Sequence, residues 1–143
     1  MNEQYQTIMN ILDTYKTAAN KKDVDAFVAL YDSDVVIFDM WGEWSYQGRT
    51  AWKKVVTDWF GSLGSEQVAV EINDTQITQE SDMACVHAFV TFKGLSAEGE
   101  ELRSMENRFT WVLINREGTW KILHEHSSGP VDLETSKVIF HRS

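Results

Sequence analysis

The sequence of 143 residues contains a single cysteine and no long apolar run. Cys85 by itself can form neither an intrachain disulfide nor a cysteine-rich zinc site, and this cysteine usage is typical of a reducing compartment. No stretch approaches the length of about 18 apolar residues that a membrane span needs, and the N-terminal residues lack the apolar segment of a signal peptide. These absences predict a cytoplasmic protein with no membrane partner.

Basic side chains are also scarce. The sequence has 13 Lys and Arg against 22 Asp and Glu, a formal net charge of −9, and no block of consecutive basic residues. Nucleic acids and anionic membrane surfaces bind positive patches, so this balance argues against both as the main partner. The length is that of a common domain. We expect one domain over residues 1–143, with residues 131–143 as a C-terminal extension after the single proline, Pro130.

Aromatic side chains are abundant instead. They make up 12% of the sequence and include six tryptophans. Such residues fill a core, line a pocket or cover an interface. Several of them, including Trp41, Tyr46, Trp52 and Phe60, gather between residues 38 and 60, and some are expected to be plain core residues.

The spacing of apolar residues predicts helices in the first part of the chain and strands in the rest. Helices are expected over 3–19, from Asp23 through Tyr31, and over 51–60 with Thr50 as the cap. Strands are expected over 35–38, 68–72, 83–92, 102–114 and 119–127. Short polar connectors favour antiparallel hairpins. The predicted fold class is α+β, with three helices packed on one face of a curved antiparallel sheet.

Four histidine and carboxylate positions are candidates for chemistry. Alternation along the last strand places His124 and His126 on one face and Glu125 on the other. Two histidines at this spacing can hold a metal, but a complete site needs further ligands, so we predict no metal and no cofactor. Asp39 ends the first strand beside the aromatic loop. It is either a turn cap or, like Glu125 and His126, a candidate for proton transfer.

Arg108 stands in the middle of a long strand, with Glu106 two residues before it. An arginine there needs a partner, because an isolated buried charge is costly. Two interpretations remain open. Arg108 forms a salt bridge with Glu106 or Glu125, or it holds a carboxylate or other planar anion of a ligand.

The order of these elements resembles the SnoaL-like branch of the nuclear transport factor 2-like superfamily. Within that branch the sequence is most similar to the association (hub) domain of calcium/calmodulin-dependent protein kinase II. The likeness rests on three motifs and covers about residues 3–131. They are Phe38-Asp39, Glu106-x-Arg108-x-x-Trp111, and the run from Gly118 to Gly129 that contains Trp120, His124 and His126.

The resemblance implies a cone-shaped fold with a pocket between helices and sheet, and homo-oligomers formed through the outer face of the sheet. It assigns pocket contacts to Trp52, Phe60 and Arg108, for a small carboxylate. The hub domain has an arginine where this chain has Ser127, so the pocket is expected to be less positive.

We therefore predict a SnoaL-like domain, forming a homodimer, that binds a small organic molecule in an aromatic cavity. The expected ligand contacts are Arg108, Trp52, Phe60, Trp41, Tyr46 and Glu106. Two alternatives stay open: an association module without catalysis, and a proton-transfer enzyme of the isomerase, cyclase or dehydratase type.

Overall fold

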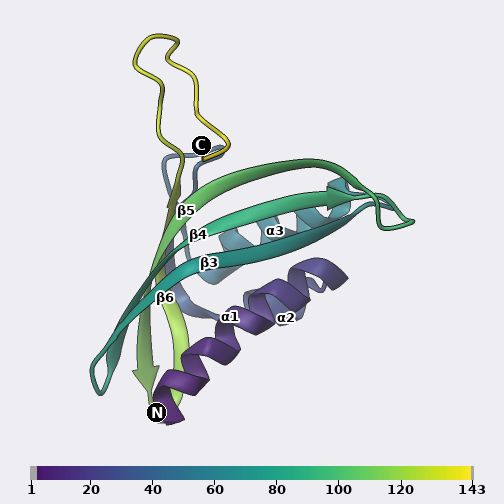
Figure 1. Cartoon of the computed structure of the whole chain (residues 1–143). Helices are drawn as coiled ribbons and strands as arrows, with labels where there is room; N and C mark the ends of the chain where they lie inside the picture. Colours follow the sequence, from purple (N-terminus) through teal and green to yellow (C-terminus); the bar gives the residue numbers. More distant parts are fainter. Residues whose placement is uncertain (1–2, 143) are drawn as a thin grey trace.

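Three helices lie in the hollow of a strongly curved sheet (Figure 1). The computed structural model describes residues 3–142. Its elements are, in chain order, α1 (Glu3–Lys21), α2 (Val24–Val28), β1 (Tyr31–Phe38), β2 (Tyr46–Gln47), α3 (Arg49–Ser62), β3 (Gln67–Gln79), β4 (Met83–Leu95), β5 (Glu101–Arg116) and β6 (Thr119–Ser128). The predicted α+β class, with helices on one face of a curved sheet, is confirmed.

The sheet has the strand order β2-β1-β6-β5-β4-β3. Strands β3 to β6 are joined by short turns and pair antiparallel, as predicted. The pairing of β1 with β6, inside the sheet, is parallel, so the prediction of an antiparallel sheet was wrong for this one pair of strands. A parallel neighbour is possible there because α3 and four strands separate β1 from β6 in the chain, which leaves ample length for a crossover.

One predicted cap and two predicted boundaries were also wrong. Thr50 was expected to cap the third helix, but it lies inside α3, whose N-cap is Gly48. Leu30 and Tyr31 were expected on the second helix, but α2 ends at Val28 and Tyr31 begins β1. Asn73-Asp74 was expected to end a strand. It lies inside β3, where the pairing with β4 shifts register between Asn73 and Gln76, and Asp74 has a φ of 56°. The polar pair forms a bulge in a long, bent strand and not a turn.

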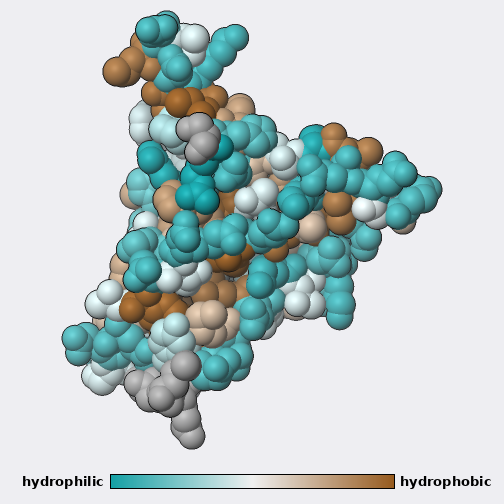
Figure 2. Space-filling model, in the orientation of Figure 1, coloured by the Kyte–Doolittle hydropathy of each residue, from teal (hydrophilic) through white to brown (hydrophobic). Residues whose placement is uncertain are grey.

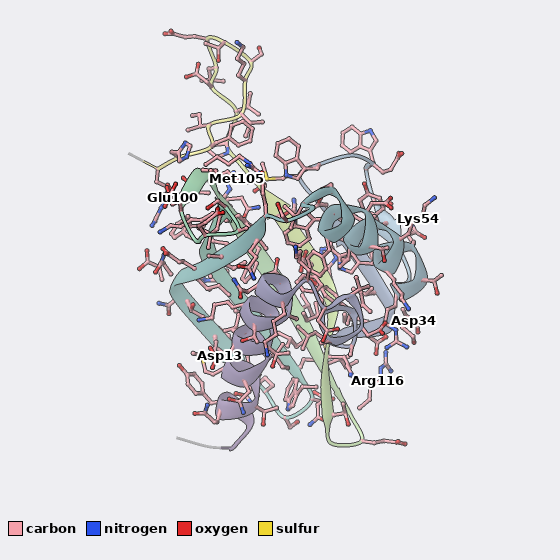
Figure 3. All side chains as sticks on the ribbon, turned by 90° about the vertical axis from the view of Figure 1, so that its right-hand side faces the viewer. Asp13, Asp34, Lys54, Glu100, Met105 and Arg116 are labelled. Atoms are coloured by element: carbon pink, nitrogen blue, oxygen red, sulfur yellow. The ribbon has the colours of Figure 1, made fainter. Side chains whose placement is uncertain are left out.

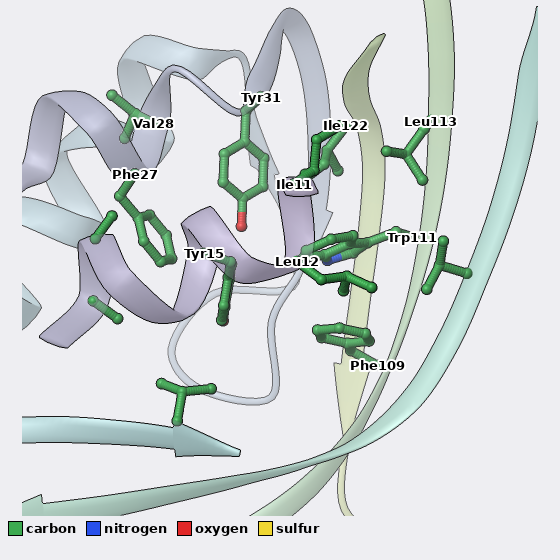
Figure 4. Packing of buried hydrophobic residues seen from close by; sticks show 14 of the residues in the cluster. Ile11, Leu12, Tyr15, Phe27, Val28, Tyr31, Phe109, Trp111, Leu113 and Ile122 are labelled. Carbon is green, nitrogen blue, oxygen red and sulfur yellow. The ribbon is translucent and has the colours of Figure 1, made fainter. Parts of the chain in front are cut away.

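The core fills the space between the helices and the concave face of the sheet (Figure 4). Helix α1 buries Ile8, Leu12 and Tyr15 on one stripe, the amphipathic pattern that predicted it. Strand β5 contributes Trp111 and Leu113, both fully buried. Alternation therefore decides which β5 side chains face the helices, and the odd-numbered ones do.

The surface around this core is mostly hydrophilic on the face drawn in Figure 2. Charged side chains such as Asp13, Asp34, Lys54 and Arg116 lie at the periphery and are exposed (Figure 3). None of the helices described is long and apolar enough to cross a membrane.

Candidate functional site

A cavity of about 680 Å³ opens between the helices and the sheet. Its volume falls in the usual range of small-molecule sites, roughly 300–1,000 Å³. Eight aromatic residues line it: Tyr15, Phe27, Trp41, Trp52, Trp59, Phe92, Phe109 and Phe140. Seven polar residues line it as well: Asp39, Arg103, Ser104, Asn107, Glu125, Ser127 and His141.

Local structure explains the aromatic walls. Trp52 and Trp59 are seven residues apart on α3, two helical turns, so both point to the same side. Phe109 on β5 stacks on Trp111 at 4.6 Å between ring centroids. Tyr15 packs edge-on against both of these rings from α1. The cavity is therefore framed by rings held in place from helix and sheet.

Glu125 is the most deeply buried charged group of the cavity, with 4% of its surface exposed. Its Oε1 accepts hydrogen bonds from the Tyr31 hydroxyl at 2.6 Å and from Trp111 Nε1 at 2.8 Å. Burial raises the pKa of Glu125 to about 7, although the Tyr31 hydrogen bond opposes the rise, and Asp39 adds to it. A carboxyl group with such a pKa can give or take a proton near neutral pH.

Asp39 follows β1 and lies beside Ser127 of β6. The Ser127 hydroxyl donates a hydrogen bond to Asp39 Oδ1 at 3.0 Å and accepts one from the Met40 backbone N–H at 3.1 Å. Burial raises the pKa of Asp39, with the Ser127 hydrogen bond opposing it. Asp39 thus makes a turn contact with the Trp41 N–H and also lines the cavity, and its role in proton transfer stays a prediction.

Tyr15 also belongs to this polar end of the cavity. Burial, with Glu125 and Asp39 nearby, raises the pKa of its hydroxyl well above the ordinary value. Tyr31 behaves in the same way for the same main reason. Figure 4 shows the Tyr31 hydroxyl directed into the cluster that contains Tyr15 and Trp111. Both hydroxyls are therefore neutral at physiological pH.

Asn107 continues the cavity-facing row of β5, two residues before Phe109. Its Nδ2 donates to Met40 Sδ at 3.3 Å. Its Oδ1 is buried and has no hydrogen-bond donor among the described residues. A buried acceptor without a donor is costly. Because almost none of its surface is exposed, a ligand in the cavity does not reach this atom.

The mouth of the cavity is formed in part by the C-terminal residues. Trp41 stacks on Phe140 at 5.6 Å between nearly parallel rings. The Glu106 backbone N–H donates to the Phe140 carbonyl, and His141 contacts the Ser104 carbonyl at 2.8 Å. Strand β6 ends at Ser128, opposite Arg108, so the earlier part of β5 has an edge free for these residues.

The structure corrects the predicted place of Arg108 and Glu106. Arg108 is exposed and hydrogen-bonds Ser128, on the sheet face that points away from the cavity. Glu106 lies on that face too and pairs with Arg142 at 3.3 Å. Because Phe109 faces the helices, even-numbered neighbours point outward, and neither side chain lines the cavity. The salt bridge of Arg108 with Glu106 or Glu125 is likewise absent from the described ion pairs.

The histidine pair lies outside the cavity as well. His124 and His126 share the outer face, as alternation predicted, and both rings pack edge-on against Phe38. His124 Nδ1 contacts the Val36 carbonyl at 2.7 Å. Within residues 3–142, no cluster of three or more histidine, cysteine or acidic residues could hold a metal ion. His126 therefore has no access to a ligand in the cavity.

Of the other predicted contacts, Trp41 and Trp52 line the cavity, whereas Tyr46 and Phe60 do not. Phe60 lies behind the wall, 5.5 Å from the Phe27 ring and 4.8 Å from the Trp59 ring. The Tyr46 hydroxyl accepts from the Glu43 N–H and donates to the Trp41 carbonyl, so it holds the loop that presents Trp41.

Sequence reasoning missed several lining residues. Asn107 could have been found, because it precedes Phe109 by two and so shares its face. Trp59 could have been found from its spacing to Trp52 on α3. Phe140 and His141 gave no signal, since an irregular segment of the chain carries no periodicity that fixes where it folds back.

Comparisons with known proteins agree with this architecture. The family model for the SnoaL-like domain matches residues 8–132. A comparison with the curated proteins gives no match. Among solved structures, a nuclear transport factor 2-like protein of unknown function from Pseudomonas putida is 22% identical, with a TM-score of 0.84, covering 96% of this chain and 94% of that chain.

Two further solved structures have the same fold. A proposed calcium/calmodulin-dependent protein kinase II association domain from Xanthomonas campestris is 20% identical, with a TM-score of 0.72, covering 85% of this chain and 84% of that chain. A proposed aromatic ring hydroxylase from Novosphingobium aromaticivorans is also 20% identical, with a TM-score of 0.65 and 85% of each chain covered. Identities this low show the fold alone.

Proposed function

The chain belongs to the SnoaL-like domain family, and from the composition of its cavity we propose that it binds a small, flat, largely apolar organic molecule there. The observation that supports this proposal is the cavity of about 680 Å³ lined by eight aromatic residues. Flat aromatic walls favour flat ligands, because rings gain from stacked and edge-on contacts beyond the burial of their area. A few polar groups at one end would fix the orientation of the ligand.

No preference for a carboxylate ligand is part of the proposal. That expectation depended on Arg108, which points away from the cavity. The cationic side chain that does line it, Arg103, is bound to Glu66 at 2.6 Å and is 59% exposed. Positive charge is therefore located at the rim and is already neutralised.

Isothermal titration with indole, a neutral flat probe, tests the proposal. Wild-type protein is expected to bind indole saturably and to melt at a higher temperature in its presence. Val55→Trp places a large side chain in the cavity from α3 and should abolish both effects. The matched control is Lys54→Trp, which adds the same side chain at an exposed position of α3.

Circular dichroism establishes that both tryptophan variants are folded. Equal binding of indole to wild type and to Val55→Trp would show that the probe binds elsewhere and would contradict the proposal. Loss of binding in Lys54→Trp as well would contradict it too, because the effect would not be specific to the cavity.

A further inference from the structure

We propose that residues 139–142 are a strap that opens and closes the mouth of the cavity, and that Arg142 is the positioning residue that holds the strap shut. The inference rests on the proposed function, because it concerns how a ligand enters and leaves the same cavity. Phe140 and His141 of the strap line the cavity, whereas Arg142 does not. All of the strap lies beyond residues 8–132, which the family model matches.

The strap meets the mouth of the cavity through aromatic stacking. Phe140 and Trp41 both line the cavity, and their rings stack at 5.6 Å between centroids with 11° between the ring planes. Trp41 belongs to the loop after β1, so the stack joins two distant parts of the chain. A flat ligand that passes between these rings has to separate them, which costs their stacking. The stack therefore opposes passage for as long as the strap stays in place.

The strap begins at a tightly packed base. The Ile139 N–H donates to the Pro130 carbonyl at 2.8 Å, and Val131 pairs with Val138, so the loop between them closes on itself. A Cβ atom on Gly129 would come within 2.8 Å of Val138 Cγ1, so glycine is what permits this close approach. Opening of the mouth therefore requires release of the far end of the strap.

Beyond its base the strap runs along an edge of β5 that β6 leaves free. The Glu106 backbone N–H donates to the Phe140 carbonyl at 2.6 Å, and His141 Nε2 contacts the Ser104 carbonyl at 2.8 Å. The Glu106 N–H thus points to this edge and not toward β4. Its protection from solvent depends on the strap.

Arg142 anchors the far end on the outer face of the sheet. Its backbone N–H and its Nε donate to the two carboxylate oxygens of Glu106, at 3.0 and 3.3 Å. Its guanidinium also pairs with Asp74 at 3.5 Å and lies 4.0 Å from the centroid of the Phe89 ring. None of these three partners lines the cavity. Arg142 therefore holds Phe140 in place from outside the cavity.

These contacts of Arg142 act together. A single exposed ion pair contributes little, but here one side chain joins two carboxylates and an aromatic ring. Glu106 is also partly buried, with 21% of its side chain exposed, so its ion pair is screened less than one in open solvent.

Hydrogen exchange followed by NMR, without ligand, measures how often the strap opens. The Glu106 amide reports on opening, whereas the Val90 amide lies inside the sheet between β3 and β5. Arg142→Gln is expected to speed exchange at Glu106 about fivefold and to leave Val90 unchanged. The matched control is Arg116→Gln, which removes an exposed, ion-paired arginine at the other end of β5 and should affect neither amide.

Stopped-flow mixing with indole measures passage through the mouth. In Arg142→Gln, association and dissociation should each become about fivefold faster, with little change in affinity, because the open fraction of the strap enters both rates. Phe140→Ala should speed both rates as well. Adding Arg142→Gln to Phe140→Ala should then have no further effect, since Arg142 acts through Phe140.

Three results would overturn the inference. Unchanged exchange at Glu106 in Arg142→Gln would show that Arg142 does not hold the strap. Faster exchange with unchanged indole rates would show that the strap does not close the route of the ligand. Equal effects in Arg116→Gln would show that loss of charge alone is responsible. Absence of indole binding to wild type would refute the proposed function and the gating with it, whereas exchange at Glu106 tests the hold of Arg142 on its own.

Discussion

At the scale of single residues, Glu125 is the residue whose state depends most on the fold. In an unfolded chain it is an ordinary surface carboxyl group with a pKa of 4.5, and in the folded protein burial raises the pKa to about 7. Between these two values the folded protein holds a proton that the unfolded chain has lost. The free energy of unfolding must therefore fall as the pH rises through this window.

Glu125→Gln removes this titration and is expected to change the pH dependence of stability. As the pH rises from about 4.5 to about 7.5, the free energy of unfolding of wild type should fall by about 3 kcal/mol relative to that of the variant. Each pKa unit corresponds to about 1.36 kcal/mol. Urea unfolding at a series of pH values measures the difference. Exposed Glu43→Gln serves as control, and parallel stability curves for wild type and Glu125→Gln would show the prediction to be wrong.

At the scale of elements, the C-terminal segment is part of the cavity and not only an appendage. Residues 139–142 run along the free edge of β5, near Met105 (Figure 3). Arg142 holds this segment through Glu106 and Asp74, and its guanidinium lies 4.0 Å above the Phe89 ring. The segment between Pro130 and Val138 extends as a loop away from the sheet (Figure 1).

Because Phe140 stacks on Trp41 across the mouth, Phe140→Ala is expected to open it. Indole should then associate and dissociate several-fold faster, with a smaller change in affinity, since both directions pass the same opening. Stopped-flow fluorescence measures both rates. Leu133→Ala, at a 99% exposed position of the same segment, is the control and should change neither rate. Unchanged rates in Phe140→Ala would show that ligands enter by another route.

At the scale of the whole molecule, the sheet has two faces with different uses. Its concave face packs on the helices and lines the cavity, whereas its outer face carries Arg108, His124 and His126 beside Phe38, which is 41% exposed. The homodimer implied by the family resemblance remains a prediction, and we propose that this face forms it.

Sedimentation velocity tests the dimer. Wild-type protein should sediment at twice the chain mass of 16.4 kDa. Phe38→Asp should shift it to the single chain mass, because a charge in the centre of an interface is costly to bury. Leu133→Asp adds the same charge far from the sheet and should not. A wild-type protein that remains monomeric at high concentration would contradict the proposal.

The sequence by itself determined most of the local structure. Apolar periodicity located the three helices and the long strands, because amphipathic stripes and alternation are set by backbone geometry. It also determined that Glu125 and Ser127 share one face of β6 and that Arg108 and Phe109 are on opposite faces of β5. The family follows from the order of these elements.

Only the tertiary structure decided which face of each strand met the helices. Alternation sorts side chains into two sets but does not say which set faces the cavity, so Arg108 was assigned to the cavity that Asn107 in fact lines. The place of Phe140 and the charge state of Glu125 also depend on the tertiary structure, for a different reason. Their contacts join residues far apart in the chain, and their burial, charge state and access to the cavity arise only when those residues pack together.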